Sequence, residues 1–184
     1  MASREDLIRH IDRLVRIVRS AKMKCVLSSV DPNPALNFWR VIHGDELDIA
    51  VLEWCKVFGT NTEPTHWKAI IPDDDQARFR ADLLVTLGIN DAAWSDYWSQ
   101  LKTYRDTLVA HHIEAEDVWH YPILDLALRS SYFYYAYLIT QFRAFGDRRF
   151  PDDLKDYAES FEAQAKEVAQ RAINATSTIK EQVY

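Results

Sequence analysis

The feature of this sequence that most constrains its fold is the spacing of its apolar residues, which recur at intervals of three and four along almost the whole chain. That interval places them on one face of an α-helix. No segment keeps the alternation of apolar and polar residues that is typical of a half-buried β-strand. The chain has only four Gly and six Pro, beside six Trp, nine Tyr and eight Phe. So few glycines argue against an all-β fold, which needs many turns. The expected fold class is therefore all-α, an up-and-down helical bundle of five or six helices.

Breaks in this spacing divide the chain into helical segments. Ser3 is suited to cap the first helix and Asn90 or Asp91 the fourth, while Gly59 and Gly88 are suited to end helices. Helices are predicted over Ser3–Ser29, Ala35–Phe58 with a break near Gly44, Asp73–Gly88, Ala92–His111, Ile123–Phe145, and from Pro151 in a first helical turn to about Thr176. The fifth of these is the most aromatic, and we expect it to be the central one.

The length of 184 residues suits one domain, and no linker, repeat or low-complexity tract divides residues 1–184. No apolar run approaches the ~20 residues that span a bilayer, and the charged N-terminal segment lacks the apolar core of a secretion signal. We therefore expect a cytoplasmic protein that does not enter membranes. The net charge of −6 argues against a protein that holds duplex DNA through many phosphates. It does not exclude an enzyme that contacts one or two phosphates.

Two apparent motifs have a simpler interpretation. Glu63 and His66 match the E-x-x-H pattern of bundles that bind two metal ions. However, Pro64 lies inside the motif, the segment is a predicted loop, and the sequence has no second copy. Cys25 and Cys55 are too few for a disulfide framework or a zinc site, and both fall on apolar helix faces, where we expect buried, unreactive thiols. No metal site and no cofactor are therefore predicted.

One segment does combine residues that suit catalysis. WSQLKTYRDTLVAHH, residues 98–112, is an apolar helix that ends with Arg105, Asp106, His111 and His112. A guanidinium offers a planar fork of donors to a phosphate. An imidazole, with a pKa near ~6.5, can take a proton from a nucleophile and return it to a leaving group. These residues suit phosphodiester chemistry without a metal. The alternative is structural: histidines favour the negative end of a helix, and Arg105 pairs with Asp106 or another neighbour.

Which histidine lies beside Arg105 depends on how this helix ends. In an α-helix, Arg105 and His112 are seven residues apart and share a face, whereas His111 is rotated by about a third of a turn. If the helix stops or tightens near Ala110, either imidazole can come beside Arg105. Both histidines therefore stay candidates on geometry.

The run YRDTLVAH, residues 104–111, resembles the R-x(4–6)-H signature of the HEPN superfamily. It is most similar to the abortive-infection U-type branch, in which the Arg is followed by a polar residue, hydrophobic residues and Ala-His. Asp106 takes the polar position. The segments LEWCKVFGT, THWKAII and LLVTLGI, followed by a tyrosine-rich helix, occur in the same order in that branch. The resemblance covers roughly residues 35–145.

This resemblance implies a homodimer of α-helical bundles in which the motif helices of two subunits form one cleft. It also implies a metal-independent RNA endonuclease of a prokaryotic phage-defence or toxin–antitoxin module, with an antitoxin or defence protein as a further partner. Arg105 would hold the scissile phosphate, and Asp106 would orient the Arg or the His. His111, with His112 as the alternative, would act as acid or base while the ribose 2′-hydroxyl attacks. Related toxins that are silenced by adenylylation carry a tyrosine where this chain has Ile113, so that control is not expected.

Two other functions compete with the ribonuclease. The first is a non-catalytic HEPN module for dimerisation or for binding a nucleotide or protein, in which Arg105 and His111 are structural. The second is a helical metal-dependent hydrolase that uses some of the histidines, namely His43, His66, His111, His112 or His120. The composite-site hypothesis makes its own structural prediction: Arg105 and His111 should lie partly exposed at a two-fold interface.

Overall fold

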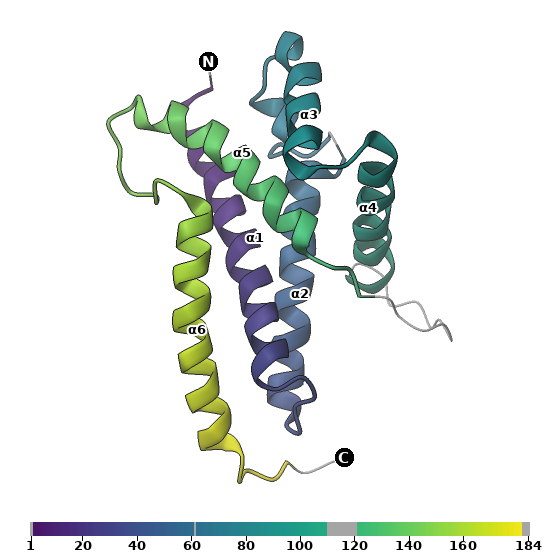
Figure 1. Ribbon diagram of the computed structural model, residues 1–184, viewed down its shortest axis with the longest axis vertical. Helices are drawn as coiled ribbons and strands as arrows, with labels where there is room; N and C mark the ends of the chain where they lie inside the picture. Colours follow the sequence, from purple (N-terminus) through teal and green to yellow (C-terminus); the bar gives the residue numbers. More distant parts are fainter. Residues whose placement is uncertain (1, 61, 110–120, 182–184) are drawn as a thin grey trace.

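The computed structural model describes residues 2–60, 62–109 and 121–181, and within these residues the fold is all-α, as the sequence predicts (Figure 1). Six α-helices are present in this part of the chain, and no strand. They are α1 (Arg4–Val30), α2 (Asn37–Phe58), α3 (Asp73–Leu87), α4 (Asp91–Tyr104), α5 (Asp125–Arg143) and α6 (Leu154–Thr176), with a short 3₁₀ helix η1 (Trp67–Ala69) and a π-helical turn η2 (Arg105–Val109).

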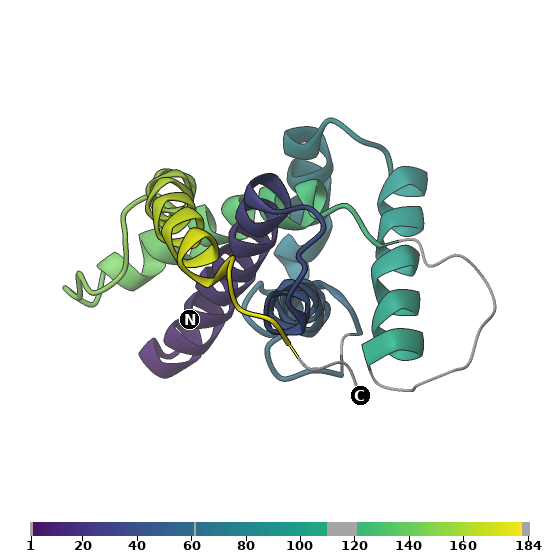
Figure 2. The same ribbon diagram turned by 90° about the horizontal axis from the view of Figure 1, so that it is seen from below.

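Helix α1 lies at the centre of the bundle, where the sequence suggested α5. It packs against α2, α5 and α6, because buried residues follow it from Leu7 to Leu27. It runs antiparallel to α2, and α5 crosses both helices obliquely (Figure 1). Helices α4 and α6 lie on opposite sides of the α1–α2 pair, which Figure 2 shows from below.

The core is built around aromatic side chains from four helices. Trp54 of α2 is fully buried and packs against Trp94 and Tyr97 of α4. Its indole Nε1 donates to the buried Ser130 Oγ of α5 at 3.0 Å. Tyr134 of α5 is also buried, and its hydroxyl lies 2.9 Å from Nδ1 of His10 in α1. Interior polar atoms therefore pair between helices, as an apolar core requires.

Most of the predicted helix ends are confirmed. Ser3 Oγ accepts from the Asp6 amide, and Asn90 Oδ1 accepts from the Ala93 amide at 2.9 Å, so both are N-caps. Gly88 ends α3 in the left-handed region, with φ 68°, where a Cβ would be strained. These ends depend on residues close in sequence, which is why local patterns predict them.

Three predictions about the helices were wrong. Helix α2 continues through Gly44 without a break. Helix α6 begins at Leu154, after Pro151, because Asp153 caps it by accepting from two backbone amides. Cys25 is exposed, because the last turns of α1 instead direct Val26 and Leu27 into a second apolar cluster with α6.

None of the helices in the described residues combines the length and the apolar character needed to cross a membrane.

Candidate functional site

The candidate site centres on Arg105, where α4 ends. Asp106, the next residue, accepts from Arg105 Nε at 2.8 Å and pairs with Nη2 at 2.6 Å, in both cases through Oδ1. The Arg105 side chain is 19% exposed and the Asp106 side chain 46%. The predicted pairing of these residues is therefore confirmed. Asp106 fixes one edge of the guanidinium, and Nη1 has no hydrogen-bond partner among the residues that the structure describes.

The backbone changes from α-helix to a wider π-helical turn at Arg105, although the sequence predicted an α-helix as far as His111. In a π-helix each carbonyl bonds to the amide five residues on, and such turns occur often at functional sites. The Thr107 hydroxyl donates to the Thr103 carbonyl at 2.7 Å within this region. The α-helical register that would place Arg105 and His112 on one face therefore does not extend past Tyr104.

His111 and His112 lie outside the described residues. Their positions relative to Arg105, and the two-fold interface expected around them, stay predictions from the sequence.

Helix α2 packs behind this turn and contributes two further groups, Asp48 and Cys55. The Tyr104 hydroxyl donates to Asp48 Oδ1 at 2.7 Å, and burial raises the pKa of Tyr104 well above its usual value. Burial also raises the pKa of the Cys55 thiol to about 11, although the nearby charge of Arg105 offsets part of the rise. Because the thiolate is the reactive form of cysteine, a buried thiol with a raised pKa is a poor nucleophile.

Two histidines of the metal-hydrolase hypothesis lie far from each other. His43 is near the start of α2, with Nε2 2.8 Å from Ser28 Oγ and 2.9 Å from Lys24 Nζ. His66 follows the end of α2, is buried, and accepts the Lys68 amide on Nδ1 at 3.3 Å. The part of α2 from His43 to its end at Phe58 spans about 22 Å, so these imidazoles do not share a metal ion.

The described residues hold no group of three or more His, Cys, Asp or Glu side chains that could bind a metal ion. His111, His112 and His120 fall outside them.

Comparisons with protein-family models, curated proteins and solved structures find no match to this chain. The HEPN resemblance is therefore carried by the motif and its flanking segments alone.

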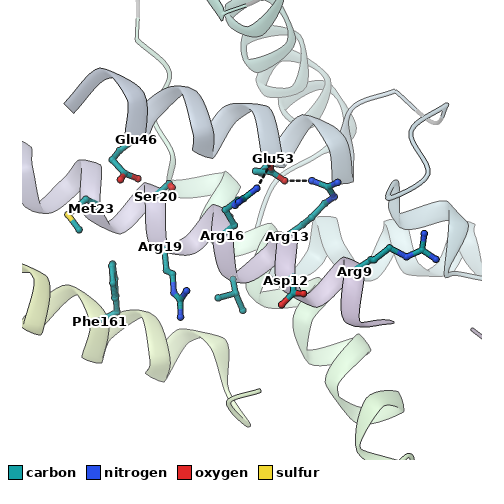
Figure 3. A pocket seen from close by; sticks show the side chains of 11 residues that line it. Arg9, Asp12, Arg13, Arg16, Arg19, Ser20, Met23, Glu46, Glu53 and Phe161 are labelled. Carbon is teal, nitrogen blue, oxygen red and sulfur yellow. Dashed lines mark hydrogen bonds and ion pairs between the residues drawn. The ribbon is translucent and has the colours of Figure 1, made fainter. Parts of the chain in front are cut away.

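A groove elsewhere in the bundle holds four arginines that the sequence analysis did not single out. It has a volume of about 680 Å³, with α1 as its floor, Glu46 and Glu53 of α2 on one side and Phe161 of α6 on the other (Figure 3). The arginines are spaced by three and four residues along α1, at Arg9, Arg13, Arg16 and Arg19. Helical spacing of like charges was the signal that sequence reasoning missed.

The carboxylate of Glu53 neutralises much of this positive charge. It is buried and pairs with Arg13, with Arg16 at 3.3 Å and with Lys56 at 3.0 Å. Burial alone would raise the pKa of Glu53, but hydrogen bonds from Lys56 and Arg13 hold it below its usual value. Asp12 and Glu46 also line the groove. Arg13 and Arg16 therefore join α1 to α2, whereas Arg9 pairs with Asp6 in α1 and Arg19 bonds to Tyr157 of α6.

The groove and Arg105 lie on different sides of α2. Glu53 faces α1, whereas Asp48 and Cys55 face the end of α4. Glu53 and Cys55 are two residues apart in an α-helix and point about 200° apart. The arginine groove therefore does not extend the Arg105 site.

A second pocket lies against α4, beside the start of the helix that ends at Arg105. It has a volume of about 570 Å³ and lies between the end of α2, η1, α3 and α4. Aromatic rings and cationic side chains line it. Its residues come from four segments, so no single stretch of sequence indicates it.

Proposed function

We propose that this chain is a metal-independent RNA endonuclease of the HEPN type, acting as a homodimer in a prokaryotic defence or toxin module. Arg105 holds the scissile phosphate and Asp106 holds Arg105. His111, the imidazole six residues after Arg105, transfers protons, with His112 as the alternative. The substrate class is RNA, because the chemistry uses the ribose 2′-hydroxyl.

The reaction is an internal transesterification. The 2′-oxygen attacks phosphorus while an imidazole takes the 2′-hydroxyl proton. A new bond forms between the 2′-oxygen and phosphorus, and the bond from phosphorus to the 5′-oxygen breaks. An imidazolium, which the second subunit can supply, protonates the leaving 5′-oxygen. The products are a 2′,3′-cyclic phosphate and a 5′-hydroxyl. The charge that develops on the phosphate oxygens is stabilised by the guanidinium.

The observation that supports this proposal is the pairing of Arg105 with Asp106. One edge of the guanidinium is bound through Nε and Nη2, which leaves the other edge to meet two phosphate oxygens. Such forked hydrogen bonds between a guanidinium and a phosphate are strong and directional. The pairing also matches the orienting role that the family resemblance assigns to Asp106.

A second candidate function has an observation in its favour. Four-fifths of the Arg105 side chain is already covered, and its pairing with Asp106 is satisfied without a ligand. These are properties of a structural arginine, as the non-catalytic HEPN module requires. That module would form a stable dimer and bind a nucleotide or a partner protein without cleaving RNA.

The test is an RNA-cleavage assay in EDTA with end-group analysis of the products. Wild type should produce cyclic phosphates, and Arg105→Ala and His111→Ala should each reduce the rate by about a hundredfold or more, because each removes a group that stabilises the transition state. Arg78→Ala is the matched control, since Arg78 is 84% exposed on α3. Circular dichroism and thermal melting check that each variant is folded.

Two results would refute the ribonuclease. Activity that EDTA abolishes would exclude the metal-independent mechanism, and full activity in both variants would exclude Arg105 and His111 as the catalytic groups. A stable dimer that binds a nucleotide and leaves every RNA intact would establish the non-catalytic module instead.

A further inference from the structure

The pocket on α4 is lined by aromatic rings. Phe58, Trp67 and Trp94 are buried in its wall, and Trp98 is partly exposed. Trp98 Nε1 donates to the carbonyls of Phe58 at 2.9 Å and Gly59 at 3.3 Å, so the end of α2 fixes the orientation of this indole. A Cβ on Gly59 would lie 2.2 Å from the Cys55 carbonyl oxygen, so only glycine allows this close turn.

Cations surround these rings. Lys68 Nζ lies over the Trp67 ring at 5.7 Å, and Lys102 Nζ lies over the Trp98 ring at 5.2 Å. Arg80 also lines the pocket and pairs with Asp91 at 2.7 Å. None of the described residues that line the pocket is a carboxylate, whereas three carboxylates line the arginine groove. The α4 pocket is therefore the better match for a ligand that is both aromatic and anionic.

The pocket and Arg105 lie along one face of the same helix. Trp98, Lys102 and Arg105 are spaced by four and three residues, so their side chains follow each other on α4. Seven residues of α-helix place Trp98 and Arg105 about 10 Å apart along the axis. A single nucleic-acid strand that lies along this face meets an indole, an ammonium and then a guanidinium.

We propose that this pocket binds an unpaired base of a single-stranded RNA, next to the phosphodiester whose phosphate Arg105 binds. The base stacks on Trp98 and the hydroxyls of Ser95 and Ser99 lie at its edge, while Lys102 contacts the neighbouring phosphate. Proteins that bind single strands combine aromatic surfaces with cations in this way. The proposal rests on the proposed function for its substrate, and its test measures binding separately from cleavage.

The test fills the pocket rather than removing its walls. Ser99 is exposed on α4 and lines the pocket, so Ser99→Phe inserts a ring without disturbing the core. Gln100→Phe is the matched control, because Gln100 is exposed on the same helix and does not line the pocket. Both changes are made in His111→Ala protein, so that RNA stays intact. Fluorescence anisotropy in EDTA measures the Kd for a labelled single strand, for its duplex and for the same strand with abasic sites.

Ser99→Phe should raise the Kd for the single strand about tenfold, the effect of losing one stacked base. Gln100→Phe should leave it unchanged, and the duplex and the abasic strand should both bind more weakly than the intact strand. An unchanged Kd in Ser99→Phe, equal binding of the abasic strand, or no binding of RNA at all would overturn the inference.

Cleavage assays on Ser99→Phe with His111 restored separate the two proposals. If wild type cleaves RNA and Ser99→Phe cleaves and binds equally well, this inference fails and the proposed function stands. If binding depends on the pocket and wild type cleaves nothing, the inference stands and the proposed ribonuclease fails.

Discussion

Charged and polar side chains have different kinds of partner in two regions of this molecule. In the core around α1, two such partners come from other helices: His10 pairs with Tyr134 of α5, and Arg13 pairs with Glu53 of α2. At the end of α4, Arg105 pairs with Asp106, its neighbour in the chain. The first kind of contact holds two helices together, whereas the second holds only one side chain in place.

This difference separates stability from function. Removal of a group in the α1 region leaves a buried partner without its hydrogen bond or counter-charge, which costs stability. Removal of Asp106 changes a side chain that is 46% exposed at a helix end, and substitutions at such exposed positions usually change stability by less than about 0.5 kcal/mol. Loss of activity at the end of α4 can therefore be measured in folded protein.

The largest expected effect is an acid sensitivity of the α1 region. Burial lowers the pKa of His10 to about 4, so the unfolded chain takes up a proton more readily than the folded one. The neutral form stabilises the fold above the unfolded pKa of 6.5, and this stabilisation is lost as the pH falls towards 4. The loss amounts to about 3 kcal/mol.

Urea unfolding at a series of pH values measures this effect, with His10→Gln as the comparison. The amide of Gln can still accept a hydrogen bond from Tyr134 but does not titrate, so the variant should lose about 3 kcal/mol less than wild type between pH 7 and pH 4. Burial also lowers the pKa of His66 to about 4, and this contribution is common to both proteins. Parallel pH curves for the two proteins would show that His10 does not control the acid sensitivity.

The next effect is the loss of the Glu53 carboxylate. Glu53→Gln should lower the free energy of unfolding by about 2 kcal/mol, because Arg13 and Lys56 lose their counter-charge. Breaking a fully buried pair costs about 3–5 kcal/mol, and the partial exposure of the cations, 30% and 35%, reduces this figure. RNA cleavage by the folded variant should equal that of wild type.

The pH dependence of the difference in unfolding free energy between wild type and Glu53→Gln provides a second check. Because the pKa of Glu53 is lowered in the folded protein, its stabilisation is present above the unfolded pKa of 4.5 and is lost as the pH falls through the folded value. Wild type and Glu53→Gln should therefore converge in stability at acid pH. A variant as stable as wild type at pH 7 would place Glu53 outside the interactions that join α1 to α2.

The sequence predicted the parts of this structure that depend on neighbours in the chain. The helices follow from apolar spacing, and the ends at Ser3, Gly88 and Asn90 follow from local hydrogen bonds and backbone freedom. The pairing of Arg105 with Asp106 is local as well, and it was foreseen. The start of α6 was missed because Pro151 is suited to a first helical turn, whereas the cap interaction of Asp153 sets the start at Leu154.

The parts that the sequence did not predict depend on how helices pack. Glu53 and Arg13 are forty residues apart, so their pairing requires the register of α1 against α2. Trp67 and Trp98 meet at one pocket only once η1 and α4 are packed together. The exposure of Cys25 likewise depends on where α6 lies. Local spacing carries none of this information.

The smallest expected effect is at Asp106, and it tests whether the end of α4 differs from the α1 region. Asp106→Ala removes the acceptor that holds Arg105 Nε and Nη2, so the guanidinium is no longer fixed towards the phosphate. Loss of such positioning should reduce kcat about tenfold, with little change in the free energy of unfolding.

Asp106→Asn is the decisive companion variant, because the amide oxygen can still accept from Arg105. It should recover most of the lost activity if Asp106 positions the guanidinium. If instead Asp106 takes up a proton during the reaction, Asn should be as inactive as Ala, since an amide does not titrate near neutral pH. A large loss of stability in either variant would show that this pair, like those of α1, holds the fold together, and the contrast between the two regions would then be wrong.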